Sequence, residues 1–97
     1  MKTKLLYQNL SDEELVEQIL KTKNTVLFEE LYDRYSKVVY NKCYGFSINE
    51  AEAKDLTQDV FIRLFIKLGS FKGDSKFSTW LYALTYNYCV NYVKRNV

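Results

Sequence analysis

Apolar residues recur at steps of three and four along most of the chain, as they do on the buried face of an α-helix. Interruptions are few, because proline is absent and glycine occurs only at Gly45, Gly69 and Gly73. This spacing divides the sequence into four long amphipathic segments, each of which needs partners to cover its apolar side. The pattern therefore predicts an all-α fold, a compact four-helix domain.

The first two segments have clear boundaries. Ser11 is followed three residues later by Glu14, a capping box that predicts the start of a helix. The second segment is expected to run from about Thr25 to Tyr44 and to end at Gly45. The predicted apolar stripes are Leu15, Ile19 and Leu20 in the first segment, and Leu27, Phe28, Leu31, Tyr35, Val38 and Val39 in the second.

The third segment has two different sides. It begins at Asn49, with Glu52 three places later as a second capping signal, and runs to Leu68 before Gly69. The broad side expected in the core contains Ala53, Leu56, Val60, Phe61, Leu64, Phe65 and Leu68. The opposite side, called the acidic strip below, contains Glu52, Asp55, Asp59, Ile62 and Ile66.

The acidic strip is unusual for a solvated helix face. Asp55 and Asp59 are like charges at i and i+4, an arrangement that costs a few tenths of a kcal/mol. Carboxylates beside isoleucines suit docking onto a basic pair of protein helices, because charge steers the encounter and the apolar side chains supply desolvated contact. The alternative is a solvated face with two incidentally exposed isoleucines.

The fourth segment is predicted to start at about Ser75 and to continue to the end of the chain. One side is expected to be core and contains Phe77, Trp80, Leu81, Leu84 and Tyr88. The other side contains Tyr82, Tyr86, Val90 and Val93. These four residues either contact a partner or pack against an element that the pattern does not reveal, and the sequence favours neither.

The loop before the fourth segment combines aromatic, basic and hydroxyl side chains, and it runs from Gly69 to Ser75. Single-stranded nucleic acid binds such surfaces, because bases stack on rings and lysines follow phosphates. Gly73 would allow close backbone approach, and Asn87 and Asn91 would offer hydrogen bonds to base edges. For Phe71 the alternative is a loop anchor packed in the core.

Composition narrows the possible functions. The 97 residues fit one domain, and 47% hydrophobic with 27% charged residues is the balance of a globular protein. Histidine is absent, which removes the commonest general base and zinc ligand. Cys43 and Cys89 lack metal-site spacing and are predicted to be buried thiols. We therefore expect no catalytic activity, no metal and no cofactor.

Charge and hydropathy also vary along the chain. Residues 1–66 carry nine Lys or Arg against eleven Asp or Glu, whereas residues 67–97 carry five against the single Asp74. The C-terminal third is therefore the basic end of the chain, while the net charge of +2 is too small by itself to indicate a nucleic-acid-binding protein. No window approaches the roughly 18 unbroken apolar residues of a membrane span, so we expect no membrane insertion and a cytoplasmic location.

Two motifs, one in the third segment and one that spans the loop and the start of the fourth segment, resemble region 2 of bacterial extracytoplasmic-function (ECF) sigma factors. They are DLTQDVF at 55–61 and SFKGDSKFSTWLY at 70–82. An earlier pattern, Phe28-x-x-Leu31-Tyr32-x-x-Tyr35, is similar to the early helical part of that family. The resemblance runs from about Asp12 to Arg95. It implies a sigma region 2 domain over 1–97 that is a transcription initiation factor rather than an enzyme.

The resemblance also implies partners and their contact residues. The third segment would dock on the clamp helices of the RNA polymerase beta-prime subunit through Asp55, Gln58, Asp59 and Ile62. The loop would be a base-recognition loop that captures a base flipped from the nontemplate single strand of the minus-ten promoter DNA. The implied DNA-binding residues are Phe71, Lys72, Gly73, Asp74, Ser75, Lys76, Ser78, Thr79, Asn87, Lys94 and Arg95. The family further implies an anti-sigma factor as a partner.

The chain departs from the family pattern at two points. The first is Ala83, which stands where many members carry an arginine, so one phosphate contact is expected to be missing. Housekeeping sigma factors have a tryptophan pair near this place, whereas Ala83 and Leu84 stand here, as is usual in the ECF branch, which predicts weaker and more sequence-strict melting of the duplex. Region 4, which reads the minus-thirty-five element, does not follow Val97, so the chain is expected to be an isolated N-terminal half.

Two rival functions remain open from the residues themselves. The first is a helical protein-interaction adaptor that binds no nucleic acid. The second is a small enzyme that uses Asp55 and Asp59 as a carboxylate pair, which the absence of histidine and of a glycine-rich phosphate loop disfavours.

Overall fold

The computed structural model describes residues 7–95, and its regular elements are all helical. In chain order the elements are α2 (Asp12–Thr22), α3 (Thr25–Tyr44), α4 (Glu50–Lys67), the 3-10 helix η1 (Leu68–Ser70) and α5 (Phe77–Arg95). No strand occurs within 7–95, so the prediction of an all-α domain with four long helices is confirmed. The predicted end of the fourth segment falls on residues 96–97, outside the described residues.

Local side-chain caps define where three of the helices begin. Ser11 and Glu14 form the predicted capping box at the start of α2. The Asn49 side chain accepts a hydrogen bond from the Glu52 N–H at the start of α4, as expected. Asn24 caps α3 in the same way through the Val26 N–H. These boundaries therefore follow from residues that lie close together in the sequence.

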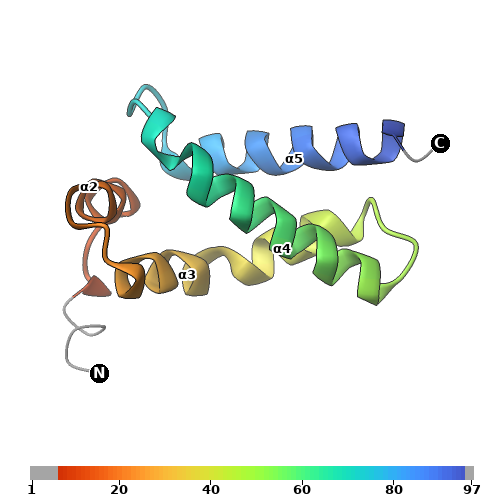
Figure 1. Cartoon of the computed structure of the whole chain (residues 1–97), viewed down its shortest axis with the longest axis horizontal. Helices are drawn as coiled ribbons and strands as arrows, with labels where there is room; N and C mark the ends of the chain where they lie inside the picture. Colours follow the sequence, from red (N-terminus) through yellow and green to blue (C-terminus); the bar gives the residue numbers. More distant parts are fainter. Residues whose placement is uncertain (1–6, 96–97) are drawn as a thin grey trace.

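Helix α3 is the centre of the arrangement, since it packs against α2, α4 and α5 (Figure 1). Helix α4 crosses α3 diagonally and also packs against α5, whereas α2 lies across one end of the molecule (Figure 1). The described chain measures 44 × 29 × 19 Å. In this layout α4 has α3 along one flank and α5 along the other, with an outer surface between them.

Most of the predicted apolar stripes are buried. The residues with no or almost no exposed surface include Leu15, Leu27, Leu31, Val39, Leu56, Val60, Leu64, Phe77 and Leu81. Three predicted core positions are wrong, because Leu20 and Val38 are 37% exposed and Phe65 is 60% exposed. Phe65 lies at the edge of the α4 stripe, where its ring and that of Phe28 pack edge-to-face with their centroids 5.2 Å apart.

The buried stripe of α5 also differs from the predicted one. It consists of Phe77, Leu81, Thr85 and Cys89, at steps of four residues. Trp80, Leu84 and Tyr88, which were assigned to the core, are half-buried. The Thr85 hydroxyl can be buried because it donates to the Leu81 carbonyl at 2.9 Å. Small side chains at two of the four buried positions allow α5 to lie close to α3.

The two cysteines are buried free thiols, as predicted, and they also meet. Cys43 of α3 and Cys89 of α5 have no exposed surface, and their sulfur atoms are 3.7 Å apart. The hydrogen bond from Cys89 lowers the pKa of Cys43, while the same bond and burial raise the pKa of Cys89. The pair therefore forms one direct contact between α3 and α5.

The second side of α5, for which the sequence favoured neither a partner nor internal packing, is only partly covered by other parts of the chain. The Tyr82 ring lies 4.5 Å from the Lys42 ammonium, and the Tyr86 ring meets Phe46 at 5.9 Å. Tyr86 nevertheless stays 60% exposed, and Val93 is 36% exposed. This side of α5 is therefore shared between α3, the α3–α4 connection and solvent.

None of the helices within 7–95 has the length and apolarity to cross a membrane.

Candidate nucleic-acid interface

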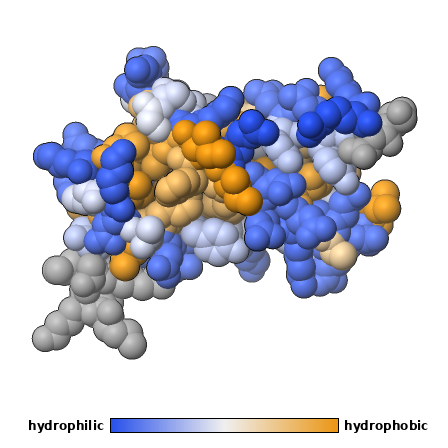
Figure 2. Space-filling view, viewed as in Figure 1, coloured by the Kyte–Doolittle hydropathy of each residue, from blue (hydrophilic) through white to orange (hydrophobic). Residues whose placement is uncertain are grey.

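The outer surface of α4 exposes a continuous apolar row. Ile62 is 52% exposed and Ile66 is 70% exposed, with Phe65 beside them. Figure 2 shows this surface as an apolar patch over the C-terminal half of α4. Asp55 is exposed on the same helix. The isoleucines of the acidic strip therefore face solvent, as expected, and form the outer crest of the helix.

The residues predicted to bind a protein partner divide between the crest and the two flanks of α4. Gln58 and Ile62 line a hollow between α3 and α4, which also contains Lys37 and Lys54. Asp59 instead lines a hollow on the α5 side, together with Ile66 and Tyr88. The predicted contact residues therefore follow one another along α4, but some face the α3 side of the helix and others face the α5 side.

Two carboxylates of the acidic strip are hydrogen-bonded to α5. The Tyr88 hydroxyl donates to Asp59 at 3.0 Å, and the Tyr92 hydroxyl donates to Glu52 at 2.8 Å. Burial and the bond to Asp59 raise the pKa of Tyr88, and the bond to Glu52 raises that of Tyr92. Glu52 and Asp59 therefore help to join α4 to α5, a role that the sequence pattern did not reveal.

The loop between α4 and α5 is anchored by one aromatic side chain. Phe71 is half-buried, and its ring packs against Phe77 at 5.6 Å and Trp80 at 5.4 Å. The structure therefore supports the anchor interpretation of Phe71, while part of the residue remains accessible. The rest of the predicted loop contacts are exposed, namely Lys72, Gly73, Asp74, Ser75 and Lys76.

Gly73 is needed for the shape of this loop. Its φ angle is +79°, in the left-handed region that side chains other than glycine rarely adopt. A Cβ at this position would have open space around it, so the backbone angle rather than crowding selects glycine. The chain can therefore turn sharply and present the neighbouring lysines to solvent.

Helix α5 begins at Phe77, two residues later than predicted. The Ser75 hydroxyl contacts the Lys76 carbonyl and does not cap the helix. Instead the Phe77 N–H donates to the Glu13 carboxylate of α2 at 2.8 Å. A carboxylate at a helix start satisfies an orphan N–H and interacts favourably with the helix dipole. The start of α5 thus depends on a contact across 64 residues.

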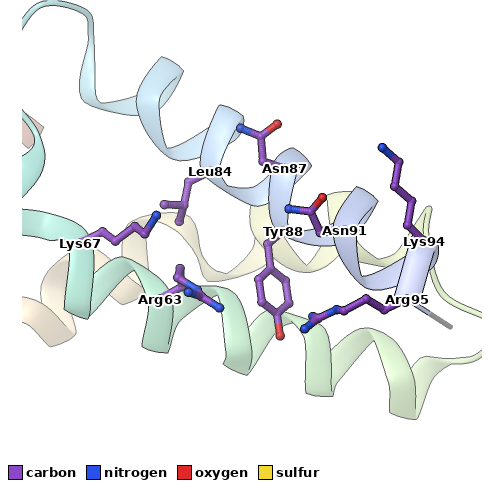
Figure 3. A pocket seen from close by; sticks show the side chains of 8 residues that line it. All are labelled: Arg63, Lys67, Leu84, Asn87, Tyr88, Asn91, Lys94 and Arg95. Atoms are coloured by element: carbon purple, nitrogen blue, oxygen red, sulfur yellow. The ribbon is translucent and has the colours of Figure 1, made fainter.

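Further along α5, a hollow of about 480 Å³ opens toward α4. Helix α5 contributes Asn87, Asn91, Lys94 and Arg95, with Leu84 and Tyr88 between the two helices (Figure 3). Helix α4 contributes Arg63 and Lys67, whose side chains extend toward α5 (Figure 3). This volume lies within the range of roughly 300–1,000 Å³ that is common for ligand pockets. We call this hollow the basic groove.

The structure brings together only some of the predicted DNA-binding residues. Asn87, Lys94 and Arg95 line the basic groove. Phe71 does not line it, because the ring packs at the beginning of α5. Ser78 and Thr79 lie in the first turn of α5, half-buried and exposed respectively. The loop and the basic groove are therefore two neighbouring surfaces along one helix.

Arg63 and Lys67 were missed from the sequence. They lie at i and i+4 on α4, a spacing that places both side chains on one side of a helix. The i, i+4 spacing was visible in the sequence, but these two side chains lie on a side of α4 away from the acidic strip. The sequence does not show which helix packs on that side.

Among residues 7–95, no group of three or more His, Cys, Asp or Glu is arranged to hold a metal ion.

Comparisons with known proteins agree on one family. The family model for sigma-70 region 2 matches residues 31–97. The ECF RNA polymerase sigma factor SigW of Bacillus subtilis (strain 168) is 35% identical over 68 residues, which are 70% of this chain and 36% of that protein. The ECF RNA polymerase sigma-E factor of Escherichia coli (strain K12) is 34% identical over 86 residues, 89% of this chain and 44% of that protein. The chain thus spans less than half the length of these relatives.

Proposed function

The chain belongs to the sigma-70 region 2 family, and we propose that it is the part of a transcription initiation factor that binds RNA polymerase and recognises the minus-ten promoter element. The resemblance to region 2 of ECF sigma factors is confirmed, since relatives of that name match most of the chain. Polymerase binding is assigned to the crest of α4, and DNA binding to the loop and to α5. We propose no catalytic role.

The crest of α4 is the single observation that carries the polymerase assignment. Ile62 and Ile66 keep more than half of their surface in water, which is unfavourable unless a partner covers them. Asp55 is exposed about two turns earlier on the same helix and would steer a basic helix pair such as the beta-prime clamp helices. Gln58, at the α3 flank, would contact the side of the same partner.

The DNA assignment is supported by the chemistry of the loop and of α5. The exposed loop carries Lys72 and Lys76, which suit phosphates, around the sharp turn at Gly73. Asn87 is exposed and lies within reach of a base edge in the basic groove. A base flipped from the nontemplate strand would lie against the accessible part of Phe71 or next to Asn87, and its binding would offset the few kcal/mol of unstacking.

Polymerase binding is tested best at Asp55, because Asp59 is also a structural acceptor for Tyr88. We expect Asp55→Lys to weaken binding to a purified fragment of the beta-prime clamp helices at least tenfold, through like-charge repulsion. Glu17→Lys, an equal charge change at an exposed position of α2, is the matched control and should bind normally. Equal binding by both variants and the wild type would remove the α4 assignment.

DNA binding is tested best at Asn87, because Phe71→Ala would also disturb the packing of Phe77 and Trp80. We expect Asn87→Ala to weaken binding to a strand selected from a random pool about tenfold, since one base contact contributes about 1–3 kcal/mol. Asn41→Ala, an exposed amide on α3, is the matched control. The adaptor hypothesis predicts no strand binding by any of the three proteins.

The remaining implications of the family resemblance stay predictions. An anti-sigma factor would be expected to cover the same exposed crest of α4 and so to compete with polymerase, which a competition pull-down would detect.

A further inference from the structure

Helix α4 contributes two cations to the same groove that contains Asn87. We propose that the single strand runs in the basic groove between α4 and α5, and that Arg63 and Lys67 bind its phosphates from the α4 side. The inference rests on the proposed function and adds a contact surface to it. Helix α4 would then bind protein through its crest and nucleic acid through its α5 flank.

The first argument is the charge of the groove. Arg63 and Lys67 come from α4, and Lys94 and Arg95 come from α5, so four positive side chains line one hollow of about 480 Å³. No acidic residue lines this hollow within the described part of the chain. Four like charges repel one another in the free protein, and a polyanion that enters between them relieves this repulsion.

The second argument is that Arg63 is held in position before any ligand binds. Its guanidinium lies 5.5 Å from the centre of the Tyr88 ring, a cation–π arrangement. Tyr88 is itself fixed by the hydrogen bond from its hydroxyl to Asp59. In Figure 3 the Arg63 side chain lies beside the Tyr88 ring, and Arg95 extends back toward the same ring. A pre-positioned cation loses less side-chain entropy on binding a phosphate.

The third argument concerns the class of ligand. Two amides of α5, Asn87 and Asn91, line the same hollow as the four cations. Guanidinium and ammonium groups bind phosphates without regard to sequence, while carboxamides can distinguish base edges. A strand that presents both phosphates and bases uses both kinds of group. The combination therefore fits a nucleic-acid strand better than an acidic peptide, which has no base edges to offer.

The proposal makes a prediction about salt. Each phosphate contact in a single strand releases bound counterions, so the slope of log affinity against log salt changes by about 0.7 for each contact. Removing two contacts with Arg63→Gln and Lys67→Gln should therefore make the slope shallower by about 1.4. The affinity should fall by the same factor for a selected strand and for its scrambled version, because phosphates carry no sequence information.

A matched control is available on the other flank of α4. Lys37 and Lys54 are exposed and line the hollow between α3 and α4. The double variant Lys37→Gln and Lys54→Gln changes the net charge equally but leaves the basic groove intact. We expect its salt slope to match that of the wild type to within about 0.3, well below the predicted change.

The experiment is a fluorescence anisotropy titration of the selected and scrambled strands, at salt concentrations from about 50 to 200 mM. The shallower slope of the groove variant alone would support the proposal. An unchanged slope in that variant, or an equal change in the control, would overturn the proposal that the strand binds in the basic groove. A poly-glutamate peptide that displaces the strand at equal charge concentration would also overturn it. Absence of strand binding by the wild type at low salt would instead refute the proposed function.

Discussion

The two flanks of α4 are joined to their neighbours by different kinds of contact. On the α3 side the rings of Tyr32 and Phe61 pack with their centroids 4.6 Å apart, and both helices contribute fully buried side chains such as Leu31 and Leu56 to the apolar core. On the α5 side the outward half of the contact is polar. There Tyr88 and Tyr92 donate to Asp59 and Glu52, and an open hollow lies beside them.

The difference separates stability from binding. Burying an apolar side chain contributes about 1.5–3 kcal/mol. The partly exposed hydrogen bond from Tyr88 to Asp59 contributes about 1 kcal/mol, because water competes for both groups. The α3 flank therefore supplies most of the stability of α4. A hollow opens on each flank, and the one toward α5 is lined by four cations. We expect substitutions on the two flanks to affect different measurements.

The largest effect is expected on the apolar flank. Leu31→Ala removes a fully buried side chain and should lower the free energy of unfolding by about 2–5 kcal/mol. Val38→Ala, on the same helix at a position that is 37% exposed, should cost less than about 1 kcal/mol. Urea denaturation followed by circular dichroism measures both. Similar costs for the two variants would contradict the apolar flank as the main source of stability.

A smaller effect is expected on the polar flank. Tyr88→Phe keeps the ring beside Arg63 but removes the hydrogen bond to Asp59, which should cost about 1 kcal/mol in stability. Tyr88→Leu also removes the ring and should in addition weaken strand binding, because Arg63 is no longer held. Comparing the two variants by denaturation and strand titration separates the bond from the ring. Equal strand affinity for both would show that the ring does not position Arg63.

A third effect concerns the start of α5. Glu13→Gln keeps an acceptor for the Phe77 N–H but removes the negative charge, so it should cost only about 0.5 kcal/mol. Glu13→Ala removes the acceptor as well and should cost about 1 kcal/mol. Amide hydrogen exchange at the first turn of α5 should speed up in Glu13→Ala without a matching change in α3. A uniform change across all helices would mean that Glu13 acts on global stability alone.

The smallest effect is expected at alkaline pH. The pKa of Tyr88 is raised in the folded protein by burial and by the bond to Asp59, so folding favours the protonated phenol. This contribution is fully present below the unfolded tyrosine pKa of about 10 and is lost as the pH rises above it. Urea midpoints at pH 8 and at about pH 10.5 should therefore differ less in Tyr88→Phe than in the wild type. An identical pH dependence would contradict the raised pKa.

Much of the fold could be predicted because the determining contacts are local. The caps at Ser11 and Asn49 connect residues three apart, and the apolar spacing of three and four fixes which side of each helix is buried. The errors at Leu20, Val38 and Phe65 all fall at the margins of stripes. At a margin, a side chain is buried only if the neighbouring helix extends far enough to cover it. The sequence of one helix does not show how far its neighbour extends.

The residues of the candidate site could be named from the sequence, but their grouping in space could not. The helical spacing placed Ile62 on an exposed face, which the structure confirms, whereas the binding roles of Asp55 and of the loop at Gly73 stay predictions. The sequence did not indicate that Asp59 faces Tyr88. It also did not indicate that Asn87 lies in a hollow with Arg63, rather than beside Phe71.

By itself, the sequence determined the four helices, the starts of α2 and α4 at short-range caps, and the presence of an acidic helix followed by a basic one. Only the tertiary structure decided which side chains of different helices meet, such as Glu13 with Phe77 across 64 residues and Asp59 with Tyr88 across 29. The reason is physical. A helix fixes the direction of its own side chains through hydrogen bonds four residues apart, whereas the neighbour that they meet depends on how all the apolar stripes are buried together.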